Sequence, residues 1–150
     1  MSSGQDALKQ VQANELGSLE GYASLLELLP LPAASINAWP YASLAPAHPD
    51  LIDRDRYTSV YGPRRIQMLR KMIASAKPKA VVFYGHVYLE SWAAIAGQPL
   101  QPASIADRPC FVTVMQSSYI VAVPHPMTWG LTNHFWESVG IHIQSKTSSA

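Results

Sequence analysis

A histidine between two prolines is the residue of this sequence best placed to do chemistry. Residues 121–140 read VAVPHPMTWGLTNHFWESVG, so His125 follows a β-branched run and precedes a helix-like segment. Proline restricts φ at positions 124 and 126, which leaves the backbone beside the imidazole little freedom to lose. The prolines either only end the strand, with the imidazole capping the loop, or they hold His125 over a ligand. A histidine held in this way can stabilise negative charge on a reacting oxygen.

Other groupings of reactive side chains are weaker. His86 and Glu90 have i, i+4 spacing, but two groups do not make a metal site, and a solvated pair is the simpler interpretation. Cys110 is the only cysteine, which excludes a disulfide framework and any thiolate cluster, and we expect it in the core. Glycine-rich phosphate loops and Gly-x-Ser-x-Gly elbows are absent from the sequence. We therefore expect neither a metal nor a cofactor.

A block of positive charge stands out against the overall net charge of +1. Between Arg54 and Lys79 there are eight lysines and arginines against the single Asp55, which gives +7 over 26 residues. Such a block favours a phosphate-bearing partner, with Arg64 and Arg65 as candidate contacts. The solvated face of a helix is the alternative interpretation.

The elements that must position these residues alternate between strand and helix. Pro63 suits the first position of a helix over 63–76, and the run AVVFYG at 80–85 is typical of a strand buried on both faces. The other expected elements are a helix at 87–96 with Gly97 as its C-cap, strands at 110–115 and 118–123, and a helix at 131–139.

The leucine-rich segment 22–32 allows two interpretations. Leucine and glutamate favour a helix, whereas the proline-rich loop that follows favours a strand ended by Pro30 and Pro32. We predict a strand. Residues 1–17 are expected to be flexible or marginally helical, 18–143 to form one domain, and 144–150 to form a flexible tail.

This order predicts an α/β fold of three layers, α/β/α, around a mostly parallel sheet. Ligands of such sheets bind beyond the carboxyl ends of the strands. The loop after Pro30, the Gly85-His86 turn and the His125 loop are therefore expected at one edge. The polar N-terminus and the lack of a long apolar run predict an intracellular, cytoplasmic protein that does not bind a membrane.

Two stretches, AKPKAVVFYGHVYLESW and VTVMQSSYIVAVPHPMTWGLTNHFWESVG, resemble the C-terminal half of the uracil-DNA glycosylase superfamily. The similarity covers roughly residues 22–143, and its most specific part is His125-Pro126 with Gly130 and Phe135 beyond. The resemblance implies a partner, single- or double-stranded DNA, from which a base is flipped and its N-glycosidic bond hydrolysed.

The resemblance also implies roles for individual residues. His125 would stabilise the departing base, and Thr128 and Gly130 would contact phosphate, although Met127 stands where relatives carry a hydroxyl residue. Trp129 or Leu131 would act as the wedge in the base stack. Gly85 and Asn37 would line the base pocket.

Two family motifs are missing from the sequence: the loop that holds the water-activating residue, and the base-reading Asn, in whose place this chain has Leu29-Pro30. The loop that holds the water-activating residue should precede residues 25–29, and GQDAL at 4–8 does not qualify because no strand can precede it. Two hypotheses follow: a uracil-DNA glycosylase-like enzyme, or a non-catalytic relative that binds nucleic acid or forms a homodimer through an exposed sheet edge.

Overall fold

The computed structural model describes residues 4–18, 21–33 and 37–148. The chain divides into two compact units, Met1–Asp53 and Arg54–Ala150. The candidate site residues all belong to the second unit, with the exception of Asn37.

The first unit contains helix α1 (Gly4–Asn14) and two short 3-10 helices, η1 (Pro40–Leu44) and η2 (Pro49–Leu51). A proline begins each 3-10 helix, where its missing N–H would have no partner in any case. Helix α1 lies within residues 1–17, for which a marginal helix was one of the two expectations.

The strand predicted in the segment 22–32 is wrong. Only an isolated bridge between Leu16 and Ala23 is found there, and Leu25 is 63% exposed. Glu27 has low strand propensity, leucine favours a helix, and Pro30 and Pro32 cannot donate to a ladder. A strand also needs a neighbour, and the described residues of this unit contain no other strand.

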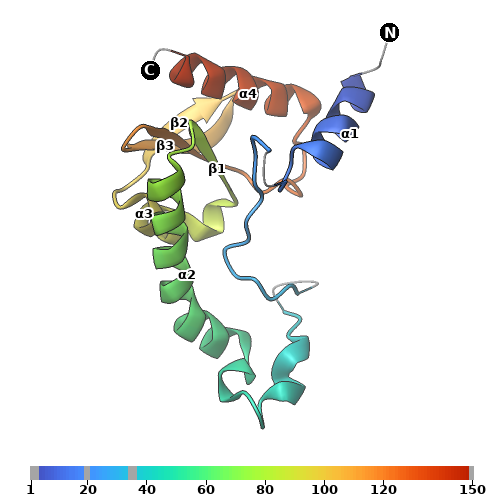
Figure 1. Cartoon of the computed structure of the whole chain (residues 1–150), viewed down its shortest axis with the longest axis vertical. Coiled ribbons are helices and arrows are strands. Elements are labelled where there is room, and N and C mark those ends of the chain that lie inside the picture. The colour runs from blue at the N-terminus through green and yellow to red at the C-terminus, as the bar shows by residue number, and fades with distance from the viewer. Residues whose placement is uncertain (1–3, 19–20, 34–36, 149–150) are drawn as a thin grey trace. The chain divides into compact units, whose positions relative to one another are not determined.

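The second unit carries the sheet and four of the helical segments (Figure 1). Its elements are α2 (Arg54–Ala76), β1 (Ala80–Tyr84), η3 (His86–Tyr88), α3 (Leu89–Ala96), β2 (Gln101–Ile105), β3 (Arg108–Met115), β4 (Ser118–Val123) and α4 (Asn133–Thr147). Strands β1, β3 and β4 and helix α3 with Gly97 as its left-handed C-cap confirm the predicted elements.

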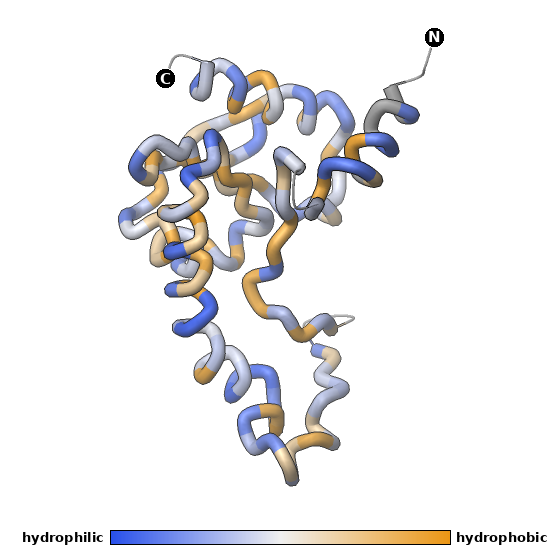
Figure 2. Tube along the Cα trace, in the orientation of Figure 1, coloured by the Kyte–Doolittle hydropathy of each residue, from blue (hydrophilic) through white to orange (hydrophobic). Residues whose placement is uncertain are grey.

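Two helices are longer than the sequence predicts. Helix α2 begins at Arg54, so Pro63 lies in its interior and not at its first position. There the proline removes one backbone hydrogen bond without ending the helix. Figure 2 shows polar and apolar residues alternating along α2, as in an amphipathic helix. Helix α4 continues to Thr147 and so includes part of the expected tail.

The sheet is mixed, and the prediction of a mostly parallel sheet is wrong. Its strand order is β1-β4-β3-β2, in which only β1 and β4 are parallel. Strand β2 was not predicted because Pro102 suggested a loop, and because the hairpin turn between β2 and β3 lacks glycine. Ala106 and Asp107 form this turn with φ of 46° and 58°, the left-handed conformation of a type I′ hairpin.

Helices cover both faces of the sheet. Phe83 stacks on Trp92 of α3, with ring centroids 4.5 Å apart, whereas the next residue, Tyr84, meets Trp136 of α4 edge-on. Because successive strand residues point to opposite faces, α3 and α4 lie on opposite sides of the sheet. The core on the α4 side consists of Ile105, Cys110, Val121, Val123, Phe135 and Val139.

Candidate functional site

The parallel strands β1 and β4 bring two predicted site segments together. The N–H of Gly85, directly after β1, donates to the Val123 carbonyl at the end of β4, at 2.9 Å. A Cβ built on Gly85 would lie 3.9 Å from the Cβ and Cδ2 of His125. The prediction that the Gly85-His86 turn and the His125 loop share one edge is therefore confirmed. The loop after Pro30 belongs to the other unit.

Gly85 is held in a conformation that other residues rarely adopt. Its φ is 92°, and its carbonyl accepts a hydrogen bond from Nε1 of Trp92 at 2.9 Å. Trp92 is 7% exposed and lies under the turn, stacked on Phe83. Trp92 thus positions the backbone on which His125 packs.

Backbone hydrogen bonds fold the loop after His125. The Thr128 N–H donates to the His125 carbonyl at 2.8 Å, and the Leu131 N–H donates to the Thr128 carbonyl at 3.4 Å. Arg108 of β3 donates from its guanidinium to the Gly130 carbonyl at 2.8 Å, and Gly130 has a φ of 79°. The loop is therefore tied to the sheet at both ends.

The imidazole of His125 is exposed, and one of its nitrogens is already engaged. Its Nδ1 accepts a hydrogen bond from the Met127 N–H at 3.2 Å. In the neutral ring the proton is then on Nε2, because one nitrogen accepts and the other donates. This arrangement leaves an N–H donor of the kind that stabilises charge on an oxygen.

Large apolar side chains project beside this histidine. Trp129 is 94% exposed and Met127 is 86% exposed, whereas Thr128 offers an exposed hydroxyl between them. Leu131 is half-buried and packs against the core on the α4 side. Of the two candidate wedges, Trp129 is the one that projects from the protein.

The sequence predicted the position of His86 at this edge but no role for its side chain. It was interpreted as half of a solvated pair with Glu90, but it is half-buried and meets Phe111 edge-on at 5.1 Å. Burial lowers the pKa of His86, and a hydrogen bond to the backbone of Ala122 acts in the opposite direction. Its Nε2 is buried without a hydrogen-bond partner among the residues that the structure describes. Its position directly after Gly85 was the available signal.

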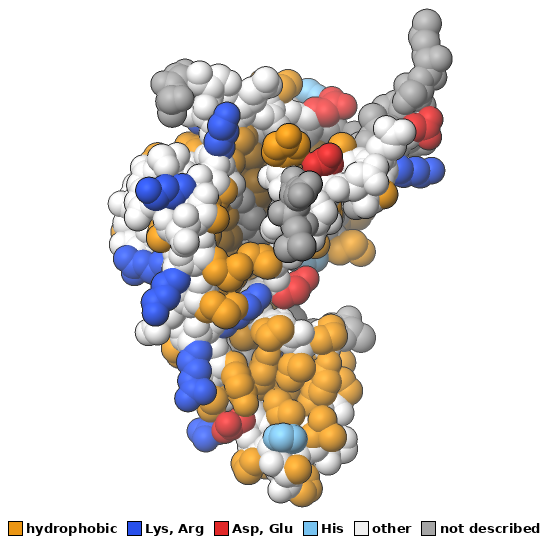
Figure 3. All heavy atoms as spheres, in the orientation of Figure 1, with side chains coloured by type: hydrophobic (Ala, Val, Ile, Leu, Met, Phe, Trp, Pro, Cys, Tyr) orange, Lys and Arg blue, Asp and Glu red, His pale blue; other side chains and the backbone are white. Residues whose placement is uncertain are grey.

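The remaining predicted residues belong to other elements. Arg64 and Arg65 are in the middle of α2, whose main contacts are with α3, and Figure 3 shows lysine and arginine side chains along the outer side of this helix. Asn37 is exposed in a turn of the first unit. The site therefore consists of Gly85, His86, His125 and the loop 127–130.

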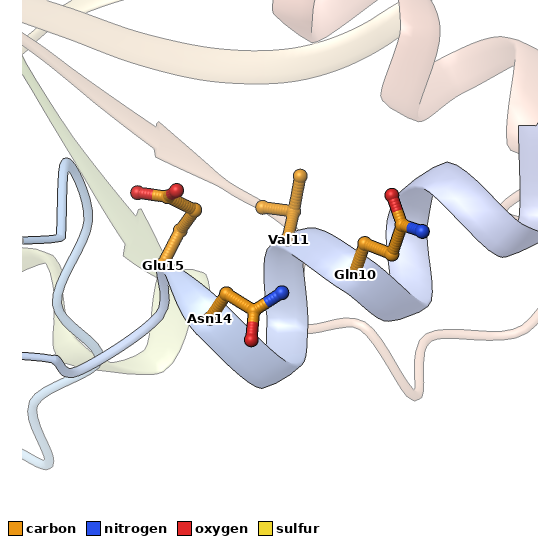
Figure 4. Close-up of a pocket in the computed structure, with 4 residues that line it drawn as sticks. All are labelled: Gln10, Val11, Asn14 and Glu15. Atoms are coloured by element: carbon orange, nitrogen blue, oxygen red, sulfur yellow. The ribbon is translucent and has the colours of Figure 1, made fainter.

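Two surface hollows are present elsewhere on the protein. One, of about 420 Å³, is lined by Lys71, Met72, Ser75 and Ala76 of α2. The other, of about 300 Å³, is lined by Gln10, Val11, Asn14 and Glu15 near the end of α1 (Figure 4). His125 and the loop 127–130 line neither of these hollows.

In the described part of the chain, no three His, Cys, Asp or Glu side chains are grouped as a metal site would require. The helices described there are also too short or too polar to cross a membrane. Comparisons with protein-family models, with curated proteins and with solved structures find no match for this chain. The resemblance to uracil-DNA glycosylases therefore stays a prediction.

Proposed function

We propose that this protein binds DNA through the His125 loop and engages a base that has left the stack, as a protein of the uracil-DNA glycosylase type. The observation that carries the proposal is the hydrogen bond from the Met127 N–H to His125 Nδ1. This bond leaves Nε2–H as a donor at an exposed edge of the sheet, where an oxygen of the base can accept from it.

Three further features support a nucleic-acid ligand. Exposed Trp129 offers a flat ring on which a base can stack. Thr132, the N-cap of α4, makes no side-chain capping bond, so the N–H groups of Asn133 and His134 are available to a phosphate oxygen. The positive block on α2 adds long-range attraction for DNA.

The same donor suits hydrolysis of the N-glycosidic bond. When that bond breaks, its electron pair stays on the base, and negative charge accumulates on the base oxygen. Water supplies a hydroxyl group to the sugar carbon and a proton to the base. His125 would stabilise the departing base through Nε2–H without itself being consumed.

The test uses the full chain and labelled oligonucleotides that differ only in one uracil or thymine. We expect preferential, salt-sensitive binding of the uracil strand, and we expect His125→Ala to weaken it about two- to tenfold, the value of one hydrogen bond. His48→Ala is the control, because it removes an exposed imidazole that makes no side-chain capping bond and belongs to the first unit. Abasic sites are measured in parallel by alkaline cleavage.

The outcomes separate the two hypotheses. Abasic sites that require His125 establish a glycosylase, whereas uracil-dependent binding without cleavage establishes a binding protein. Equal affinity for both oligonucleotides, or equal effects of the two histidine substitutions, would overturn the proposal.

A further inference from the structure

The first strand of the sheet has an edge that no described residue pairs with. Strand β1 is at the end of the order β1-β4-β3-β2, and its ladder partner is β4. An unpaired edge is a template for another strand, and proteins usually protect such edges with charge or proline. The sequence of β1, AVVFY, contains neither.

The direction of each backbone group follows from the bonds at the two ends of β1. Lys79 accepts from the Tyr119 N–H, and Gly85 donates to the Val123 carbonyl, so the odd-numbered residues 79–85 face β4. The N–H and C=O groups of Ala80, Val82 and Tyr84 therefore point away from the sheet. These six groups have no hydrogen-bond partner among the described residues.

We propose that a second copy of this chain pairs with β1 in antiparallel orientation, about a twofold axis at Val82. In this register Val82 lies opposite Val82, and Ala80 lies opposite Tyr84 of the other copy. Each of these facing pairs exchanges two hydrogen bonds, so all outward groups of both strands are satisfied. The result is one continuous sheet of two copies, closed by an isologous contact.

Charge favours the antiparallel register. Lys79 precedes β1, and in a parallel pair the two Lys79 side chains would lie on neighbouring strands, about 5 Å apart along the hydrogen-bonding direction. In the antiparallel pair they are six residue positions apart, about 20 Å, beyond a Debye length at physiological salt. The two copies therefore meet without like-charge repulsion.

The opposite edge of the sheet is protected. Ile105 and Arg108 flank the two-residue turn between β2 and β3 and form a hydrogen-bonded pair. Because alternate residues face the neighbouring strand, the backbone groups of Pro102 and Ser104 point outward. Pro102 has no N–H to offer a further strand. The edge at β2 is protected and the edge at β1 is not, so β1 is the edge that we expect to pair.

Sedimentation equilibrium of the full chain tests the proposal over about 1 to 100 µM, a range that covers micromolar dissociation constants. We expect a dimer of twice the chain mass of 16.4 kDa. Ala80→Pro removes two of the intercopy hydrogen bonds and none from the β1–β4 ladder, so dimerisation should weaken about ten- to hundredfold. Ser104→Pro, the matched change at the protected edge, should leave the dimer unchanged.

A second variant distinguishes a specific loss of the dimer from misfolding of the Ala80→Pro variant. Tyr84→Lys puts a cation beside Ala80 and Lys79 of the other copy, and it should likewise produce monomers with an unchanged circular dichroism spectrum. A parent chain that is monomeric throughout the range overturns the proposal, and so does a dimer that both β1 variants leave intact. Slow amide exchange at Ala80 and Val82 in a monomer would assign the edge to another segment of the same chain. The proposal does not depend on DNA binding.

Discussion

Replacing Trp92 by phenylalanine is expected to destabilise the protein by about 2.5–4.5 kcal/mol, through the loss of a hydrogen bond and of buried apolar area. Phenylalanine keeps a six-membered ring that can stack on Phe83. It loses the Nε1–H that donates to the Gly85 carbonyl at 2.9 Å. That carbonyl would retain only a long bond of 3.5 Å from the Tyr88 N–H.

The magnitude combines two effects. Loss of a buried hydrogen bond that leaves its acceptor poorly satisfied costs about 1–3 kcal/mol. Removing two further ring carbons from a site that is 7% exposed costs about 0.8 kcal/mol for each. Because Gly85 supports His125, relaxation of the turn should also weaken binding of the uracil oligonucleotide.

Urea denaturation followed by far-ultraviolet circular dichroism measures the free energy of unfolding of parent and variant. Trp129→Phe is the matched control, since the same chemical change at a side chain that is 94% exposed should cost less than about 0.5 kcal/mol. Similar costs at the two positions would refute the argument that Trp92 supports the turn.

The remaining predictions concern the loop, the histidines and the turn. Trp129→Ala should weaken binding of single-stranded DNA about five- to 150-fold, the value of one stacked base, in a fluorescence anisotropy titration; an unchanged affinity would remove Trp129 from the interface. Burial lowers the pKa values of His86 and His142, so both rings stay neutral in the folded protein below the pH at which they protonate in the unfolded chain. The free energy of unfolding, measured by urea titration, should therefore fall as the pH decreases below about 6.5, and these two histidines should not change it at higher pH. His86→Gln should reduce this loss of stability at low pH. An identical pH dependence in the variant and the parent would contradict the explanation. Gly85→Ala should destabilise the protein by about 1–2 kcal/mol because the φ of Gly85 is 92°. Gly140→Ala should stabilise it by about 0.5–1 kcal/mol, because Gly140 lies inside α4 with open space where a Cβ would be. A variant with the same melting temperature as the parent chain would contradict the prediction made for it.

The local sequence pattern predicted correctly those elements for which the residues and the tertiary packing favour the same secondary structure. The apolar run that became β1 and the glycine after α3 each have one simple interpretation, and the structure bears both out. The placement of His125 beside Gly85 was also predictable, because carboxyl ends of neighbouring parallel strands share an edge.

The failures have physical causes outside the local pattern. The turn at Ala106 and Asp107 adopts a glycine-like backbone without glycine, so β2 gave no hairpin signal. The segment 22–32 is apolar as a buried strand would be, but the described residues of its own unit contain no strand with which it could pair. The burial of His86 depends on Phe111, which is distant in sequence and reaches it only through the sheet.

The claim that most of this account depends on is the Nε2–H donor of His125 and its engagement by a base. A long-range ¹⁵N–¹H correlation spectrum of the histidine rings, recorded before and after addition of a uracil oligonucleotide, tests it directly. We expect His125 to be the Nε2–H tautomer in the free protein, with its Nε2 signal shifting on binding while the signals of His48 stay in place. A proton on Nδ1 in the free protein, or a bound state in which the His125 signals do not move, would contradict the account.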